Sequence, residues 1–355
     1  MIYAKNESWK AVALWLLCAA ALCLFLTDPA TAAKGVQSGL HACVETIIPT
    51  MFPFFVLSRI LLSGQGAVWL SWPLRPLTIA MGISSPKAPS AVVCGWLGGF
   101  AAGADQVSQL YRQREISKKQ GSLLLIASTV SGPSFVAAGV GARLLGNAAV
   151  GWMMFAAQCA AAALCAILFS FIIPQEKGDA GRKAGAVQGK GCDASEAVAS
   201  AVQATTILCG YVTLFSFLSA YAAPLGNGVR YAMCFFLEVT NACIAAAESD
   251  TGLRVAMCAA ALSAMGASVF LQVRAFAGKE ISLKPLLISR VVHLPLMLFF
   301  TRLLLSIFPS IRSAAVWENV YASRLPADAA CVLFVLCALA MHGKTEGLRK
   351  QKKRV

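Results

Sequence analysis

Long uncharged apolar stretches dominate the hydropathy pattern of this chain. Residues 11–27, 148–173 and 255–273 contain no Asp, Glu, Lys or Arg. Each stretch is close to or above the about 17–25 residues that a helix needs to cross about 30 Å of hydrocarbon. Because apolar and polar residues do not alternate along them, these stretches satisfy their backbone hydrogen bonds as helices rather than as barrel strands. The pattern predicts an all-α, polytopic helical membrane protein.

Other apolar runs predict further membrane spans, and together they raise a problem of topology. These runs lie at about 47–63, 88–104, 122–146, 204–222, 229–247, 253–275, 284–308 and 327–342. Ten full spans with the basic tail 344–354 in the cytoplasm place the basic loop 112–119 outside, against the positive-inside rule. Either the segment 68–81 also enters the membrane or one predicted span is re-entrant. The sequence leaves both alternatives open.

Composition supports the membrane assignment and excludes other classes. The residues AVILMFWYC make up 58% of the 355 positions and DEKR only 13%, whereas an ordinary globular chain has about 25% charged residues. The net charge of +14 comes from dispersed loops and the tail, without the basic face interleaved with aromatics that nucleic-acid binding requires. We therefore expect no nucleic-acid partner and read the basic tail as a cytoplasmic segment that can touch membrane lipids. Most of the 13 cysteines lie in apolar runs without a CxxC pair, which favours packing roles.

An apparent internal duplication suggests how the chain is divided. Gln106-Val107 is followed by Arg114–Ser117, and Gln272-Val273 is followed at similar spacing by Lys279–Ser282. Internal repeats with discontinuous helices are characteristic of secondary transporters. We predict an N-terminal transmembrane helix acting as a signal anchor, two repeats, a flexible basic linker between them, and a last helix with a basic tail. The corresponding boundaries are 1–33, 34–175, 176–193, 194–310 and 311–355, and homo-oligomer formation is possible.

A break is predicted in the middle of the apolar run 122–146. Proline removes a backbone donor and obstructs the preceding turn, so Gly132-Pro133 should interrupt the helix and free backbone groups that lipid cannot satisfy. The functional interpretation is a half-helix N-terminus that faces an anionic group. The alternative is a kink satisfied by hydroxyls and neighbouring helices. The candidate substrate-binding residues at this break are Thr129, Ser131, Gly132, Pro133 and Ser134.

A carboxylate interrupts another apolar run. Glu238, followed by Thr240 and Asn241, lies in residues 231–247, where an ionised side chain costs a few kcal/mol unless it faces a cavity or a partner. It is a candidate for binding the substrate or a coupling ion, against a structural ion pair with Arg143, Arg290 or Arg302. Ser268 and Gln272 are the candidate hydrogen-bonding residues at the second, pseudo-equivalent site. His293 is more typical of a packing residue.

Enzyme signatures are absent from the sequence. It has no Walker A loop, no HExxH and no GxSxG, and its three histidines are scattered. We expect no catalytic residues, no cofactor and no bound metal. Uphill transport would have to draw on an ion gradient or on consumption of the solute.

Six blocks, in order along residues 35–310, carry a resemblance to a known family. IPTMFPFFVLSRILLSGQG, GWLGGFAAGADQVSQLY, SGPSFVAAGVGARLLGN, CGYVTLF, LEVTNAC and GASVFLQV resemble the sporulation integral membrane proteins of the YlbJ (SpoVV) type, within the wider nucleoside-recognition or "Gate" group. Two departures stand out: residues 99–105 lack the Tyr, Pro and Lys of the family's Gly-Tyr-Pro turn, and Ala242 replaces a glycine.

The resemblance implies a fold and a function. It implies two Gate-like repeats with discontinuous helices in a multi-pass protein of the cell membrane, located in the mother-cell-derived outer forespore membrane. The implied function is transport of dipicolinate, a small aromatic dianion, from mother cell toward forespore. The alternatives are a non-transporting membrane protein of spore maturation and a nucleoside-type transporter.

Overall fold

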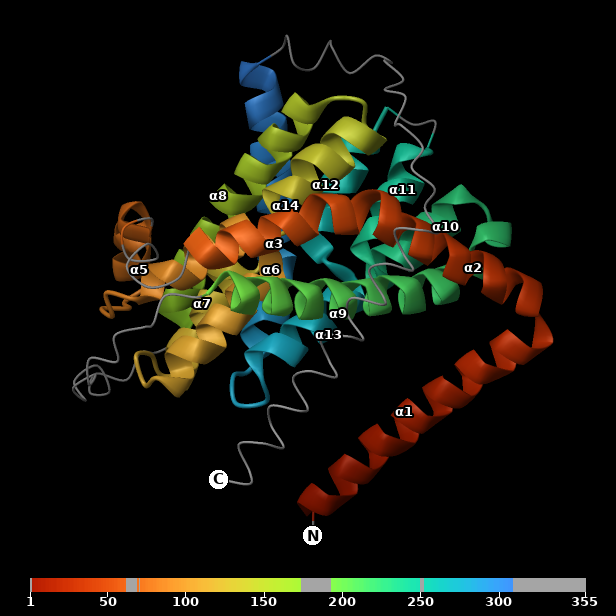
Figure 1. The fold of residues 1–355 in the computed structure, drawn as a ribbon, viewed down its shortest axis with the longest axis horizontal. Helices are drawn as coiled ribbons and strands as arrows, with labels where there is room; N and C mark the ends of the chain where they lie inside the picture. Colours follow the sequence, from red (N-terminus) through yellow and green to blue (C-terminus); the bar gives the residue numbers. More distant parts are fainter. Residues whose placement is uncertain (1, 62–68, 70, 174–192, 250–251, 309–355) are drawn as a thin grey trace.

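The regular structure of the chain is helical. The computed structural model describes residues 2–61, 69, 71–173, 193–249 and 252–308 (Figure 1), and every regular element within them is a helix. Four helices in these ranges are long and apolar enough to cross a membrane, or five if a bent N-terminal pair forms one span. The four are α8 (Ala148–Ile172), α9 (Ala194–Ala220), α12–α13 (Arg254–Ala277) and α14 (Lys284–Ile307). These findings confirm an all-α, polytopic membrane protein.

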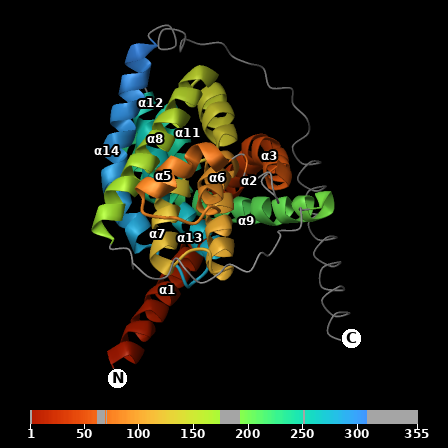
Figure 2. The ribbon, with the colours of Figure 1, turned by 90° about the vertical axis from the view of Figure 1, so that its left-hand side faces the viewer.

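The bent N-terminal pair begins with an apolar helix. α1 (Ile2–Thr27) extends away from the rest of the molecule (Figures 1 and 2). The direction then changes by 108° into α2 (Pro29–Ala42). Asp28 caps α2, because its carboxylate accepts a hydrogen bond of 3.0 Å from the amide of Thr31.

Small residues let α2 lie directly on the backbone of α9. A Cβ added to Gly35 would stand 2.8 Å from the Cα of Phe217, and one added to Gly39 would stand 2.7 Å from the Cα of Thr213. Glycines four residues apart at a helix–helix contact are typical of membrane proteins, where close backbone approach replaces the hydrophobic effect between helices.

The next elements are short. η1 (Cys43–Ile47) is a π-helical turn that runs into α3 (Ile48–Leu61), and η2 (Trp72–Leu74) leads into α5 (Arg75–Ala80). With six residues, α5 is far too short to cross a bilayer. The described part of 68–81 therefore supplies no additional span.

The core elements are interrupted helices. They are α6 (Ala88–Arg112), α7 (Lys118–Ser128), η3 (Ser134–Leu144), α10 (Asn227–Leu237), α11 (Val239–Ala247), α12 (Arg254–Ala264) and α13 (Gly266–Ala277), with the short η4 (Ala223–Leu225) before α10. α7 lies deepest, because every residue from 121 to 128 is buried. It packs against α6 and α8, and α8 packs against α14.

Several of the spans predicted from the sequence differ from the observed helices. The break predicted in 122–146 is confirmed, because α7 ends at Ser128 and η3 begins at Ser134. The predicted span 253–275 is confirmed as α12–α13, although its backbone is interrupted at Met265-Gly266. The runs predicted as spans at 88–104 and 229–247 are each interrupted, at Gly99 and at Glu238. The predicted last span 327–342, the tail 344–354 and nearly all of the linker 176–193 lie outside the described residues.

Candidate functional site

α6 is a helix folded back on itself, which we call the first hairpin. At its tip Gly99 has φ 77° and ψ 177°, a conformation essentially restricted to glycine. A Cβ on Gly103 would lie 2.8 Å from the Cα of Gly95, although eight residues of straight helix span about 12 Å. The side-chain amide of Gln106, on the second arm, donates a 3.0 Å hydrogen bond to the hydroxyl of Ser90 on the first arm. The two arms of α6 therefore run side by side.

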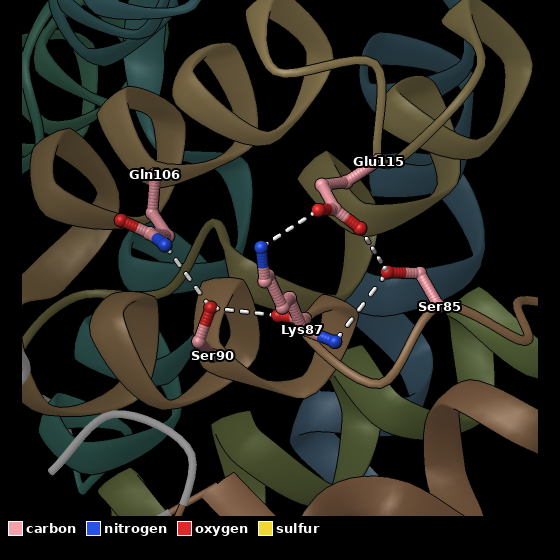
Figure 3. A network of polar contacts seen from close by, with 5 residues as sticks. All are labelled: Ser85, Lys87, Ser90, Gln106 and Glu115. Atoms are coloured by element: carbon pink, nitrogen blue, oxygen red, sulfur yellow. Dashed lines mark hydrogen bonds and ion pairs between the residues drawn. The ribbon is translucent and has the colours of Figure 1, made fainter. Parts of the chain in front are cut away.

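The open end of the first hairpin is closed by an ion pair (Figure 3). Lys87 Nζ lies 2.7 Å from Glu115 Oε1. The other carboxylate oxygen of Glu115 accepts a 3.3 Å hydrogen bond from the Ser85 hydroxyl. Lys87 precedes α6 and Glu115 follows it, so this network joins the beginning and the end of the hairpin.

We call α7 and η3, with the break between them, the first broken helix. The tip of the first hairpin contacts this break. A Cβ on Gly99 would lie 3.4 Å from the amide nitrogen of Gly132, and a Cβ on Gly132 would lie 3.4 Å from that of Gly99. The break is thus packed backbone to backbone against the hairpin tip. Close to it, the Trp96 indole donates a 2.9 Å hydrogen bond to the carbonyl of Ala127, in the last turn of α7.

α10 and α11 form a second hairpin of the same kind. Its open end is closed by Arg230 Nη1 and Glu248 Oε2, 2.5 Å apart, although the two residues are 18 positions apart in the sequence. Its tip is Glu238, whose extended backbone (φ −156°, ψ 127°) separates the two helices. The carboxylate of Glu238 then accepts a 2.8 Å hydrogen bond from the amide of Asn241 and so caps α11.

The tip of the second hairpin meets the break between α12 and α13, the second broken helix. Met265 and Gly266 both have positive φ, 72° and 68°. A Cβ on Gly266 would lie 2.9 Å from the amide nitrogen of Glu238 and 2.9 Å from the carbonyl of Leu237. Only glycine fits this contact, since a side chain would collide with the hairpin backbone. Each hairpin tip therefore rests on one helix break.

The two hairpins and the two broken helices border one hollow. It is narrow, with room for about 10 Å³, or about one water molecule, inside about 260 Å³ of space that includes the part open to the outside. Its lining combines the first hairpin, the first and second broken helices and the second hairpin with η1, α3 and α9. The lining residues are Ile47, Met51, Phe100, Phe135, Leu208, Glu238, Val239, Thr240, Val269 and Gln272. Seven of these ten side chains are apolar, so the polar groups are concentrated on Glu238, Thr240 and Gln272.

Glu238 is the ionisable residue of the hollow. It is 1% exposed, and none of the ion pairs in the described part of the chain includes it. Its position at the start of α11 stabilises a negative charge through the helix dipole. Asn241, which donates its backbone amide to Glu238, is itself held by a 2.8 Å hydrogen bond from its side chain to the Ser216 hydroxyl of α9.

The predicted ion-pair partners of Glu238 are engaged elsewhere or stand alone. Arg143 pairs with Glu45, which links η3 to η1. Arg302 is exposed on α14, and the Arg290 guanidinium has no hydrogen-bond partner. The structural ion pair proposed for Glu238 is therefore not present among the described residues.

The structure brings some predicted site residues together and separates others. Glu238, Thr240 and Gln272 line the hollow, and Gln272 donates a 2.9 Å hydrogen bond to Ser268, one turn earlier on α13. Of the break residues, Thr129, Ser131, Gly132 and Pro133 are buried and Ser134 is half-buried. They lie beside the hollow rather than in its lining, and the neighbouring residue Phe135 lines it instead.

Sequence reasoning missed the first hairpin and part of the lining. Gly98-Gly99 within an apolar run was the available signal for the tip, and Gly266 was the signal for the second break. The apolar lining residues Phe100, Phe135 and Val269 carry no signal that distinguishes them from ordinary core. Among the described residues there is no group of three or more His, Cys, Asp or Glu side chains that could hold a metal ion.

Comparisons with known proteins give one informative relative. No protein-family model matches the chain, and no solved structure matches it. The chain is 27% identical over 145 residues to the sporulation integral membrane protein YlbJ of Bacillus subtilis, a match that covers 38% of this chain and 34% of the relative. The match thus spans about a third of the relative's length. Together with the apolar helices, it supports a multi-pass membrane protein that is similar to a sporulation membrane protein.

Proposed function

We propose that this protein is a membrane transporter of a small anionic solute. The observation that carries the proposal is one hollow bordered by both hairpins and both broken helices, with the tip Glu238 in its lining and each hairpin tip packed against a helix break. Discontinuous helices that end at a shared polar site are the usual construction of secondary transporters, since broken ends supply backbone groups and dipoles to a solute. A helix break with a purely structural role would not need a hairpin tip packed against it.

Glu238 fits a coupling ion better than it fits the anionic solute. An ionised carboxylate repels an anion, whereas it attracts a sodium ion or takes up a proton. We therefore assign Glu238, with Thr240 and Gln272, to the coupling ion. The solute anion is assigned to the side of the hollow next to the break at Gly132-Pro133, where the half-helix N-terminus favours negative charge.

The hollow suggests how the solute is enclosed. The hollow has room for about 10 Å³, far below the roughly 300–1,000 Å³ of ordinary ligand sites. A solute of the size of dipicolinate therefore requires the hairpins to separate from the broken helices. The ion pairs Lys87–Glu115 and Arg230–Glu248 keep each hairpin together, so that it can move as a unit.

Dipicolinate is the candidate solute, because of the resemblance to YlbJ-type proteins. The corresponding location is the outer forespore membrane. The two alternatives are a nucleoside-type transporter and a membrane protein that supports spore maturation without transport.

Uptake into proteoliposomes tests the proposal. The purified full chain is reconstituted, and labelled dipicolinate is offered with a proton gradient, with a sodium gradient and with neither. We expect accumulation of dipicolinate that depends on one of the gradients. Uptake of labelled nucleosides in its place would identify the nucleoside-type transporter, and uptake of neither solute by correctly inserted protein would refute the proposal.

A further inference from the structure

A buried arginine without a partner lies away from the hollow. Arg290 on α14 is 6% exposed, and none of its Nε, Nη1 and Nη2 atoms has a hydrogen-bond partner. A guanidinium carries five N–H donors and stays protonated. None of the ion pairs in the described ranges includes Arg290. Its positive charge is therefore uncompensated by the described side chains.

Two further polar side chains near Arg290 are also incompletely bonded. Gln158 on α8 and His293 on α14 are both 0% exposed. Neither the nitrogen nor the oxygen of the Gln158 amide has a partner, and His293 Nε2 has none. The other ring nitrogen, Nδ1, lies 2.7 Å from the hydroxyl of Ser263 on α12.

The helix geometry places these groups in one interface. Arg290 and His293 are three residues apart and so lie on the same face of α14. Gln158 and Cys165 are two turns apart on α8, and the Cys165 thiol lies 3.9 Å from the carbonyl of Ser289, next to Arg290. The His293 ring lies beside the backbone of Gln158, and Arg290 is close enough for its charge to act on His293. Three helices, α8, α12 and α14, enclose the cluster.

Physical chemistry requires a partner for this cluster. On insertion scales an arginine at the centre of a membrane-spanning helix costs about 2.5–3.5 kcal/mol, and charged residues within such helices normally face a partner or a water-filled cavity. Water would satisfy the donors but would leave the charge unbalanced in a low-dielectric interior. An anion does both. The cluster can offer the guanidinium donors, the Gln158 amide group, and the Nε2–H of the His293 tautomer whose Nδ1 accepts from Ser263.

We propose that Arg290, Gln158 and His293 form a buried site for a small monovalent anion, with chloride as the simplest occupant. The site is separate from the hollow, because none of the three residues lines it. Bulky anions are excluded by the nearly complete enclosure of the three side chains. Binding at this site does not require that the protein transports anything.

Thermal unfolding of the purified full chain tests the site. The midpoint is measured in chloride and in gluconate at equal ionic strength and pH, since gluconate is too large to enter. We expect chloride to raise the midpoint of the parent by several degrees, because a ligand that binds only the folded state stabilises it. Arg290→Gln should lose this rise. Arg302→Gln, an exposed arginine on the same helix, should keep it and serves as the matched control.

A second variant keeps the test decisive if Arg290→Gln does not fold. Gln158→Leu retains volume and removes the amide donor, and binding of radioactive chloride to it is compared with binding to the parent. We expect affinity to fall about tenfold, equivalent to about 1.4 kcal/mol. Equal midpoints of the parent in chloride and gluconate, or chloride binding unchanged by Gln158→Leu, would overturn the proposal.

Discussion

The two hairpins of this protein, α6 and α10–α11, share a construction and differ in their chemistry. In both, an ion pair joins the open ends and the tip rests on a glycine of a broken helix. The first tip is Gly99, which carries no charge and meets Gly132 at ordinary contact distance. The second tip is Glu238, which is buried and meets Gly266 too closely for any side chain. The acidic tip Glu238 lines the hollow, whereas beside the neutral tip it is the neighbouring Phe100 that lines it.

Under the proposed function, the difference would give the two sides of the hollow separate tasks. A neutral tip beside a half-helix N-terminus is suited to an anion, whereas an acidic tip is suited to a cation or a proton. Two identical acidic tips would repel the proposed solute, and two neutral tips would leave no group to respond to an ion gradient. In the proposed transporter, coupling between ion and solute would depend on having both tips beside one hollow.

The largest expected effect comes from neutralising the acidic tip. Glu238→Gln keeps the size of the side chain and its cap on α11 but removes the charge. We expect it to abolish gradient-dependent uptake in proteoliposomes while the protein still inserts and folds. Glu196→Gln is the matched control, because it removes an exposed carboxylate in the first turn of α9 and should leave uptake near normal. Normal uptake by a well-inserted Glu238→Gln protein would remove the role of the acidic tip.

The next effect concerns the two glycines on which the tips rest. Gly266→Ala places a Cβ 2.9 Å from the backbone of the second hairpin at a φ of 68°. We expect it to destabilise the protein by about 3 kcal/mol or more. Gly132→Ala makes ordinary contacts with the first tip and should change stability by less than about 0.5 kcal/mol. Thermal unfolding in detergent measures both, and equal shifts would show that the two tips are packed alike.

Whether a helix break could be predicted from the sequence depends on the residue at that break. Gly132-Pro133 predicts an interruption, because proline removes a backbone donor and obstructs the preceding turn. Glu238 contains no such signal: the helix ends there because the carboxylate finds the amide of Asn241, an arrangement that depends on the hairpin around it. The ionisable residue of the site was found because a charge in an apolar run needs a reason.

The remaining features depend on three-dimensional contacts. Lys87 and Glu115 lie 28 residues apart in the sequence, and nothing local indicates that they meet. The segments Gln106–Ser117 and Gln272–Ser282, predicted to be equivalent, begin in different kinds of element: Gln106 lies in a hairpin arm and Gln272 in a broken helix. In chain order, each hairpin is followed by a broken helix and then by a long helix, α8 or α14. The division into two repeats at 34–175 and 194–310 stays a prediction.

A smaller effect is expected when the neutral tip loses its broken partner. Replacing Gly132 and Pro133 together by alanine allows a continuous helix, which would bury the amides now available to an anion. We expect affinity for dipicolinate to fall at least about tenfold, equivalent to about 1.4 kcal/mol. Gly132→Ala alone retains the proline and should bind like the parent. An unchanged affinity of the double variant would place the solute elsewhere.

The smallest effects distinguish the ion pairs at the two open ends. The Glu115 side chain is 8% exposed and that of Glu248 is 55% exposed. Removing the charge of Glu115 leaves Lys87 without its partner and weakens the bond from Ser85, so we expect Glu115→Gln to destabilise by about 1–2 kcal/mol. An exposed pair contributes about 0–1 kcal/mol, so Glu248→Gln should have little effect.

Salt dependence separates these two contributions more sharply than their size does. At 1 M salt the screening length falls to about 3 Å, which weakens exposed pairs far more than buried ones. The unfolding midpoints of both variants and the parent are therefore compared at low and high salt. The shift caused by Glu248→Gln should disappear at high salt, and most of the shift caused by Glu115→Gln should remain. If both shifts vanish together, the first hairpin is held no more firmly than the second, and the two hairpins differ only at their tips.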